Sequence, residues 1–472
     1  MADGKRVTIV GGGPVGALNA CYLSKKGYIV DLYESRSDIR KTENAVGRSI
    51  NLALSLRGIE ALKEVGLDEK VKALGIPMRA RMIHLVNGKC YPVPYGKSGQ
   101  HLLSVDRMKL NRDVLSAASE FPNVDLHFNH KFVSCDLATA KSTFVKTSPQ
   151  LPDKEEVTIT SDAIFGCDGA HSAVRRQLQK RRFDYSQQYI PHGYKELTIP
   201  PTEDGKYAMP ANYLHIWPRH EFMLIALPNQ DMSFTCTLFM AFSIFDTLTT
   251  EQKVLDFFRE VFPSAVDLIG EELLKTDFFL LPPLPMVTVK ASPYHYKDKV
   301  VLFGDAAHAC VPFYGQGLNA GLEDVLVFHE ILEKHNYAFD VAFSAFSEQR
   351  SKDGHAVADL SHQNYIEMRS SVTSSWFLFR KKVDSLLSFL CPSVFTPKYE
   401  MVAFTRTPYH KVIEKSELQY KYVNYGLAAL CVLMFIGGSR LAWKAHKGEL
   451  HMSELPHLES LLAIKNRFQN LV

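Results

Sequence analysis

Three glycines near the N-terminus constrain the fold of this chain more than any other feature. Gly11, Gly13 and Gly16 follow the apolar, β-branched run 7–10, and the residues after them have a helical pattern that ends at Gly27. Glycines at this spacing let the chain turn sharply, bring the backbone close to a pyrophosphate, and pack a helix tightly against a strand. The sequence therefore predicts a strand–turn–helix unit whose helix N-terminus binds the phosphates of a dinucleotide.

An acidic residue ends the second strand of this unit. The strand is expected over residues 29–34, and Glu34 lies 18 positions after Gly16. A carboxylate at this place accepts hydrogen bonds from the hydroxyl groups of an adenosine ribose. With its flanking strands and helix, the motif indicates a dinucleotide, but it does not distinguish NAD from FAD.

A second glycine-rich segment follows the strand expected over residues 300–303. Asp305 lies at the carboxyl end of that strand, where open α/β sheets place their ligands, and its carboxylate can bind the hydroxyls of a ribityl chain. Gly317 allows close approach of the backbone, and a new helix is expected near Leu318, with its N-terminus positioned to stabilise negative charge on a reduced ring. The plain alternative is an ordinary strand–turn–helix connection. No second metal ligand accompanies His308, so a structural role is expected for it.

A third segment, with Asp168, Ser172 and Arg175, follows the apolar strand expected over residues 163–166. By turn chemistry alone, Asp168 or Ser172 could simply bond to the backbone of a capped turn. The order and spacing of the three segments add a second interpretation. The patterns G-x-G-x-x-G, D-G-x-x-S-x-x-R and G-D-A-A-H-x-x-x-P resemble those of the class A flavoprotein aromatic monooxygenases, the family that includes p-hydroxybenzoate hydroxylase.

Four further runs narrow the resemblance to the kynurenine 3-monooxygenases of that family. They are residues 48–55, 76–82, 183–194 and 364–368, and the similarity extends roughly from residue 7 to residue 410. The resemblance implies a cofactor site that includes Gly11, Gly13, Val15, Gly16, Glu34, Arg36, Ala53, Arg107, Asp168, Asp305, Gly317, Leu318 and Asn319.

The same resemblance implies the chemistry. One tightly bound FAD would be reduced by NADPH, which has no nucleotide-binding domain of its own, and the chain agrees in having a single G-x-G-x-x-G motif. Through a C4a-hydroperoxyflavin, O2 would then hydroxylate L-kynurenine beside its aniline nitrogen to give 3-hydroxykynurenine, a step of tryptophan catabolism. The flavin carries this chemistry, so no catalytic side chain is assigned, and the protein supplies orientation and a dry pocket.

An amino-acid substrate needs a fixed partner for its carboxylate. Arg81 is the first candidate, because the arginine fork fits a carboxylate with two parallel hydrogen bonds. Tyr95, Asn364 and Tyr399 match family positions at the same end of the substrate. Without the resemblance, Arg81 would be an ordinary solvated arginine in an alternating strand, and the tyrosines ordinary core or surface residues. Beside the flavin motif, Phe313 and its neighbour Tyr314 could line the aromatic pocket or simply pack.

The length of 472 residues predicts two or three domains. Three antiparallel strands are expected over residues 213–217, 222–227 and 234–240, a pattern unlike the α/β start, so a sheet-containing substrate domain is expected as an insertion in a Rossmann-like FAD-binding domain. Apolar residues recur at helical spacing over 317–334 and about 341–372, whereas the polar stretch 141–156 is left without an assignment. The expected divisions are FAD-binding domain over 1–182 and 299–375, substrate domain over 183–298, and a helical C-terminal region over 376–472.

The C-terminal region contains an apolar run without charge, residues 423–439, flanked by Lys421, Arg440 and Trp443. Its length is at the lower limit for a membrane-spanning helix, and basic and aromatic flanks are typical of an anchor over about 423–443. The alternative is a buried helix of a soluble domain. The tail resembles that of the eukaryotic family members only in type, which implies the mitochondrial outer membrane with the catalytic part facing the cytosol.

Composition limits the other functions. The net charge of +3, without blocks of like charge, gives no support for nucleic-acid binding, and no residues with metal-ligand spacing are found. The eight cysteines form no C-x-x-C pair, which favours free thiols in a reducing compartment, and the N-terminus carries no secretory or organellar presequence pattern. Three alternatives remain open: an FAD enzyme with another aromatic substrate, a silent flavin-fold scaffold at a membrane, and an NAD-dependent dehydrogenase.

Overall fold

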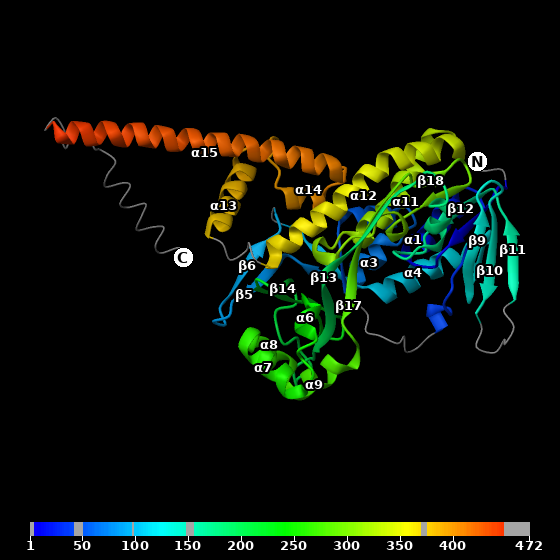
Figure 1. The fold of residues 1–472 in the computed structure, drawn as a ribbon, viewed down its shortest axis with the longest axis horizontal. Coiled ribbons are helices and arrows are strands. Elements are labelled where there is room, and N and C mark those ends of the chain that lie inside the picture. Colours follow the sequence, from blue (N-terminus) through cyan, green and yellow to red (C-terminus); the bar gives the residue numbers. More distant parts are fainter. Residues whose placement is uncertain (1–3, 42–50, 97–98, 148–154, 370–374, 448–472) are drawn as a thin grey trace. The chain divides into compact units, whose positions relative to one another are not determined.

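The computed structural model describes residues 4–41, 51–96, 99–147, 155–369 and 375–447 (Figure 1). The chain divides into two compact units, Met1–Ile413 and Glu414–Val472. The first unit holds the four β-sheets and the residues of every candidate site.

The first sheet is the predicted dinucleotide-binding sheet. It has the order β18-β19-β12-β1-β2-β8, and its strands run parallel except for the antiparallel edge strand β18. Helix α1 begins at Pro14, ends at Lys25, and packs against α4 and α11. The strands are apolar runs because both faces of a parallel sheet are covered. Their bounds are Arg6–Val10 (β1), Ile29–Tyr33 (β2), Val124–His127 (β8), Ala163–Gly166 (β12), His295–Tyr296 (β18) and Val300–Leu302 (β19).

The second sheet has seven strands in the order β17-β13-β16-β15-β14-β5-β6 and is antiparallel except for the parallel pair β14–β5. The three strands expected in the middle of the chain are confirmed as β14, β15 and β16. The bounds are Ala80–His84 (β5), Cys90–Pro94 (β6), Asp184–Ile199 (β13), Tyr213–Arg219 (β14), Phe222–Pro228 (β15), Phe234–Ala241 (β16) and Leu284–Ser292 (β17). Helices with a common apolar core against this sheet are α6 (Phe242–Phe245), α7 (Glu251–Val261), α8 (Pro263–Ile269) and α9 (Glu271–Leu280).

Two three-stranded sheets complete the first unit. One consists of β3 (Asn51–Leu54), β7 (Leu102–Asp106) and β4 (Ile76–Met78), and the other of β11 (Glu156–Thr160), β10 (Lys141–Lys146) and β9 (His130–Asp136). The shorter helices of this region are η1 (Ile39–Lys41), α2 (Leu56–Lys63), α3 (Asp68–Leu74), α4 (Arg107–Ser119), α5 (Ala173–Leu178), α10 (Asp305–His308) and η2 (Pro312–Tyr314).

The C-terminal part of the described chain is helical. Its helices are α11 (Gly317–Lys334), α12 (Phe339–Arg369), α13 (Ser375–Leu390), α14 (Lys398–Phe404) and α15 (Tyr409–His446). The expected apolar helix is confirmed within α15, which is long and apolar enough to cross a membrane, and its most apolar window is not buried.

The expected domain division stays a prediction, but the strand pairing adds one observation to it. Strands β5 and β6 lie within the expected FAD-binding region 1–182, yet they extend the seven-stranded sheet. The reason is that β5 pairs in parallel with β14, from Tyr213↔Ala80 to Ile216↔Ile83, and so joins the seven-stranded sheet. Arg81 is thereby carried into the second sheet.

Candidate functional site

The glycine motif forms the turn that the sequence predicts. Gly11 has a φ of +108°, and a Cβ atom there would overlap the carbonyl of Cys167, while one on Gly16 would overlap the carbonyl of Gly11. Gly13, in contrast, has open space where a side chain would be, and as the N-cap of α1 it leaves the first N–H groups of the helix without a side-chain cap. The space and the free donors together fit a pyrophosphate.

Glu34 and Arg36 lie together at the end of β2. The Glu34 carboxylate accepts hydrogen bonds from the backbone N–H of Gly12 at 2.8 Å and from Arg36, through its backbone N at 2.9 Å and its Nε at 2.8 Å. Burial opposes ionisation of Glu34, but the hydrogen bonds and charge of Arg36 outweigh it and hold its pKa below the ordinary value. An ionised acceptor beside the glycine turn fits the ribose role expected for Glu34.

The second segment leads from β19 through a strained turn. Gly304 has a φ of +57°, and a Cβ atom there would crowd the side chain of Val15. Val15 of the glycine motif therefore lies next to this turn. Asp305 follows as the first residue of α10 and is exposed at the carboxyl end of the strand. Helix α11 begins at Gly317, and Gly317 and Leu318 are half-buried in its first turn. An exposed carboxylate and a helix N-terminus therefore lie along one segment, as a flavin requires.

Asn319 connects this helix to β3. Its Nδ2 donates to the carbonyls of Ala53 at 2.9 Å and Gly315 at 2.6 Å, and its Oδ1 accepts from the backbone N of Ser55 at 2.8 Å. Both amide hydrogens are thus used within the protein. Asn319 therefore holds Ala53 beside the glycine turn at residue 315, and its own side chain has no donor left for a cofactor.

The third segment is a capped turn that also braces the site. Asp168 accepts hydrogen bonds from the backbone N of Ala173 at 2.6 Å and from Ser172 Oγ at 2.5 Å, at the start of α5. Burial raises its pKa, although the bonds from Ser172 and the backbone oppose that shift. Arg175 is buried and donates to the carbonyl of Ala306 at 2.8 Å, which joins this turn to α10. The segment therefore ties two parts of the candidate cofactor site together.

Arg107 lies at the start of α4, on a different element from the three glycine- and aspartate-containing segments. It is exposed as the first residue of α4, whose N-cap Asp106 accepts from the backbone N of Lys109 at 2.9 Å. The preceding strand β7 pairs with β3, with Ser104 opposite Ala53. Arg107 thus follows the strand next to Ala53. The run 48–55, which carries part of the resemblance, lies outside the described residues up to residue 50.

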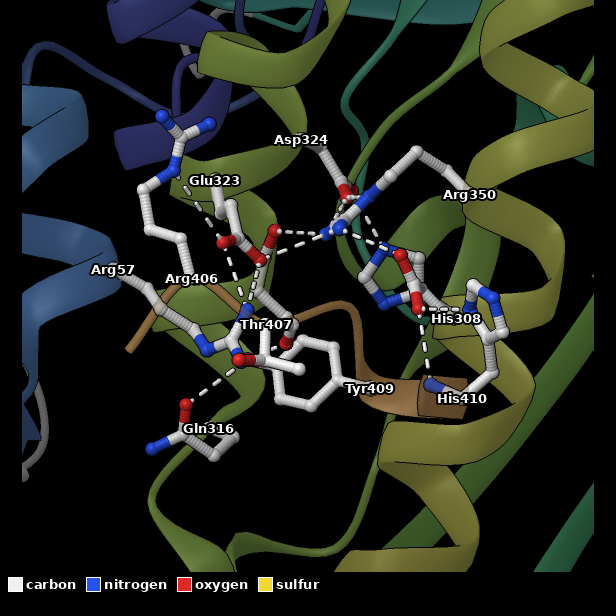
Figure 2. A network of polar contacts seen from close by, with 12 residues as sticks. Arg57, His308, Gln316, Glu323, Asp324, Arg350, Arg406, Thr407, Tyr409 and His410 are labelled. Atoms are coloured by element: carbon white, nitrogen blue, oxygen red, sulfur yellow. Dashed lines mark hydrogen bonds and ion pairs between the residues drawn. The ribbon is translucent and has the colours of Figure 1, made fainter. Parts of the chain in front are cut away.

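A buried ionic network lies behind the second segment (Figure 2). Asp324 accepts hydrogen bonds from the backbone N of Gly304 at 2.9 Å, from His308 Nε2 at 2.5 Å and from Arg350 Nε at 2.9 Å. Burial disfavours both charges, yet the attraction of Asp324 raises the pKa of His308, and His308 with Arg350 lowers the pKa of Asp324. The buried ion pair with Asp324 fits the structural role expected for His308.

The same network extends to the beginning of α15. Arg57 is fully buried, donates to both oxygens of Glu323 at 2.8 Å and to the carbonyl of Thr407 at 2.5 Å, and lies 4.0 Å over the ring of Tyr409. The Tyr409 hydroxyl in turn donates to Gln316 Oε1 at 3.0 Å (Figure 2). Sequence reasoning missed this network, because nothing local distinguishes a buried arginine or glutamate from a solvated one.

The four candidate substrate residues fall into one arginine–tyrosine group and one separate amide. The Arg81 guanidinium lies 4.4 Å over Tyr399 and 5.7 Å over Tyr95, and the two rings are stacked at 5.4 Å. Within the described chain, Arg81 Nε and the Tyr95 hydroxyl are buried without a hydrogen-bond partner. Burial raises the pKa of both tyrosines, so their hydroxyls stay protonated. The group thus offers buried donors around one cation.

Asn364 contacts the aromatic residues that follow the second segment. The Asn364 Nδ2 donates to the carbonyl of Phe313 at 2.8 Å, and Phe313 stacks on Tyr365 at 3.9 Å. Tyr314 stacks on Tyr399 at 5.4 Å, so it joins the glycine-rich segment to the arginine–tyrosine group. Phe313 and Tyr314 both pack against other aromatic rings. Tyr365, which stacks on Phe313, was missed by sequence reasoning, although it is next to Asn364.

Comparison with known proteins shows the family to which the chain belongs. A family model for an FAD binding domain matches residues 5–361. The chain is 53% identical over 422 residues to kynurenine 3-monooxygenase of Sus scrofa, which covers 89% of this chain and 88% of that protein. It is 50% identical over 437 residues to kynurenine 3-monooxygenase of Anopheles gambiae, with 92% and 89% covered.

Solved structures are similar in fold. A tetrameric form of 2-methyl-3-hydroxypyridine-5-carboxylic acid oxygenase aligns with a TM-score of 0.63 at 19% identity, over 79% of this chain and 94% of that chain. A p-nitrophenol 4-monooxygenase from Pseudomonas putida aligns with a TM-score of 0.63 at 18% identity, over 82% and 94%. The fold class expected from the sequence is confirmed.

Proposed function

The chain belongs to the kynurenine 3-monooxygenase family of FAD-dependent aromatic monooxygenases, and on this premise we propose that it hydroxylates L-kynurenine to 3-hydroxykynurenine. NADPH as the reductant, O2 as the co-substrate and the C4a-hydroperoxide route are part of the proposal. The observation that carries it is the half-buried Arg81, which lies over the rings of Tyr95 and Tyr399. Its buried Nε and the buried Tyr95 hydroxyl have no hydrogen-bond partner within the described chain.

Different cofactor residues would bind different parts of FAD. The turn at Gly13 and the N-terminus of α1 would hold the pyrophosphate, Glu34 the adenosine ribose, and Asp305 the ribityl chain. Asp168 and Asn319 act as braces, since their side chains are bonded to α5, β3 and the turn before α11. When bound and reduced, the flavin supplies the oxygen-transfer chemistry.

The substrate residues orient the ring for that chemistry. Arg81 would bind the α-carboxylate by two parallel charge-assisted hydrogen bonds, with the hydroxyls of Tyr95 and Tyr399 as further donors. Phe313 and Tyr365 would exclude water beside the aniline ring, which suppresses unproductive loss of H2O2. Asn364 holds the Phe313 backbone in place. A base is not needed, because the amino group already makes the ring electron-rich.

The test is a substrate panel with the purified, FAD-loaded full-length chain. L-Kynurenine should stimulate NADPH oxidation strongly, and mass spectrometry should find one oxygen atom from isotopically labelled O2 in 3-hydroxykynurenine. The control substrates are D-kynurenine, anthranilate and p-hydroxybenzoate. A stronger, product-forming response to another aromatic would replace kynurenine as the substrate, and a colourless protein that cannot be reconstituted with FAD would leave the silent-scaffold alternative.

We further propose that α15 anchors the protein in the mitochondrial outer membrane, with the first unit facing the cytosol. The support is that α15 is long and apolar enough to cross a membrane. In isolated mitochondria the full-length chain should resist alkaline extraction, and external protease should digest the first unit. Release by alkali would contradict a spanning helix.

A further inference from the structure

One side of α13 carries an apolar strip, defined by Trp376, Phe379, Leu386, Phe389 and Leu390. These side chains recur at intervals of three, four and seven residues along one helix face, and they are between 46% and 82% exposed. On the opposite side Asp384 is buried, and Lys381 on that side pairs with Glu367 of α12. The helix is therefore held by one face while the strip stays in contact with solvent, an arrangement that marks an interaction site more often than a free surface.

The charges around the strip favour an anionic lipid surface as its partner. Asp384 is the sole acidic residue in the sequence of α13, and it is buried, so the helix exposes no carboxylate. Lys382 is exposed, and the preceding Arg380 and Lys381, both half-buried, add positive charge. Tryptophan and phenylalanine on one side with basic residues beside them are typical of helices that lie in the membrane interface.

The chain itself indicates where such a membrane would be. Helix α13 ends at Leu390, and the helix that is apolar enough to cross a bilayer begins at Tyr409. The 18 residues between them can span at most roughly 65 Å even when fully extended. A bilayer that holds α15 is therefore a surface close to which α13 is tethered.

We propose that α13 inserts its apolar strip into the headgroup boundary of an anionic membrane and so forms a second, interfacial contact in addition to α15. The proposal rests on the membrane attachment proposed above. A helix of this kind enters about 5–10 Å into the boundary between headgroups and acyl chains. The strip would then orient the first unit on the membrane, which a single spanning helix does not do.

The three tryptophans of the chain make this testable on the full-length, FAD-loaded protein. Trp376 reports on α13, Trp443 reports on α15, and Trp217 is fully buried in the first unit as an internal reference. Trp443→Phe isolates the signal of Trp376, Trp376→Phe isolates that of Trp443, and the double variant gives the reference. Each protein is reconstituted into vesicles of phosphatidylcholine with phosphatidylserine, brominated either near the headgroup or near the end of the acyl chains.

We expect most of the Trp376 emission to be quenched, and more by the shallow bromines than by the deep ones. Leu386→Glu with Phe389→Glu should abolish this quenching and leave kynurenine hydroxylation in detergent unchanged. A matched control is Phe279→Glu with Leu280→Glu, exposed residues of the same types on α9, which should leave Trp376 quenched.

The outcomes separate this proposal from the anchor. Quenching of Trp443 without quenching of Trp376 would refute the α13 contact while the α15 anchor stands, including the case in which a second copy of the chain covers the strip. Absence of both signals would refute the attachment and the α13 contact together. Equal quenching of Trp376 in the Leu386→Glu/Phe389→Glu variant would show that the strip does not carry the contact.

Discussion

Arg81 provides the sharpest prediction, because it can be removed without touching the cofactor segments. It lies in β5, its guanidinium is stacked over Tyr399, and its Nε has no hydrogen-bond partner within the described chain. Arg81→Ala should therefore remove the carboxylate partner of the substrate. Arg81→Lys keeps the charge but loses the planar fork and the stacking.

The magnitude follows from the hydrogen bonds that each variant loses. A hydrogen bond to a charged group contributes about 1.5–3 kcal/mol, so the two bonds of a fork contribute about 3–6 kcal/mol. Since about 1.4 kcal/mol corresponds to a factor of ten, Arg81→Ala should lower kcat/KM for L-kynurenine roughly 10²–10⁴-fold. Arg81→Lys, which keeps one bond, should lower it roughly 10–10²-fold.

The assay is a thermodynamic cycle between enzyme and substrate. Hydroxylation of L-kynurenine and of its decarboxylated analogue is measured for the wild type and both variants, together with the flavin spectrum. If Arg81 binds the carboxylate, the wild type and Arg81→Ala should differ by less than about threefold on the analogue. Arg79, an exposed neighbour outside β5, supplies the matched control, and Arg79→Ala should behave as the wild type. Equal losses of Arg81→Ala on both substrates would refute the reasoning.

Three further predictions concern the cofactor segments. Asp305→Ala should lose FAD during purification, whereas Asp305→Asn should lose less, as the visible spectrum will show; full yellow colour in Asp305→Ala would exclude the ribityl role. Gly13→Ala should fold but bind FAD at least about tenfold more weakly, since its methyl enters the space for the pyrophosphate. Gly16→Ala should fail to fold, since its methyl overlaps the carbonyl of Gly11, and equal soluble yields would contradict this contrast. The raised pKa of His308 stabilises the fold fully below about pH 6.5, and this stabilisation is lost as pH rises through the folded-state pKa. His308→Asn should therefore flatten the decline of thermal stability above pH 6.5, and an unchanged decline would exclude His308 as its cause.

Local sequence patterns predicted those parts of the site that depend on neighbouring residues. The turn at Gly11, the strand before Asp305 and the helix that begins at Gly317 are each determined by residues within a few positions. Strands β14, β15 and β16 of the second sheet were likewise predicted, because apolar runs of strand length bounded by turn-like connectors are a local signal.

Other parts depend on contacts between residues far apart in the sequence. The amide of Asn319 bonds to Ala53, 266 positions away, and Arg57 bonds to Glu323 at the same separation, so no window of sequence contains either pair. Strand β10 escaped detection in the polar stretch 141–156, because it lies in a small sheet where only alternate residues, such as Phe144, are buried. Resemblance to a family supplied Arg81 and Tyr399, which periodicity alone would have left as ordinary residues.

The ionic network around Arg57 determines where the chain can be truncated to make a soluble form without the apolar helix. A truncated form should keep Thr407 and Tyr409. Without them the buried Arg57 would lose the Thr407 carbonyl as a hydrogen-bond acceptor and the Tyr409 ring that it stacks on. Val412 is also fully buried, so the safe place to cut lies beyond it. The first residues of α15 belong to the first unit, and the proposed anchor begins only after them.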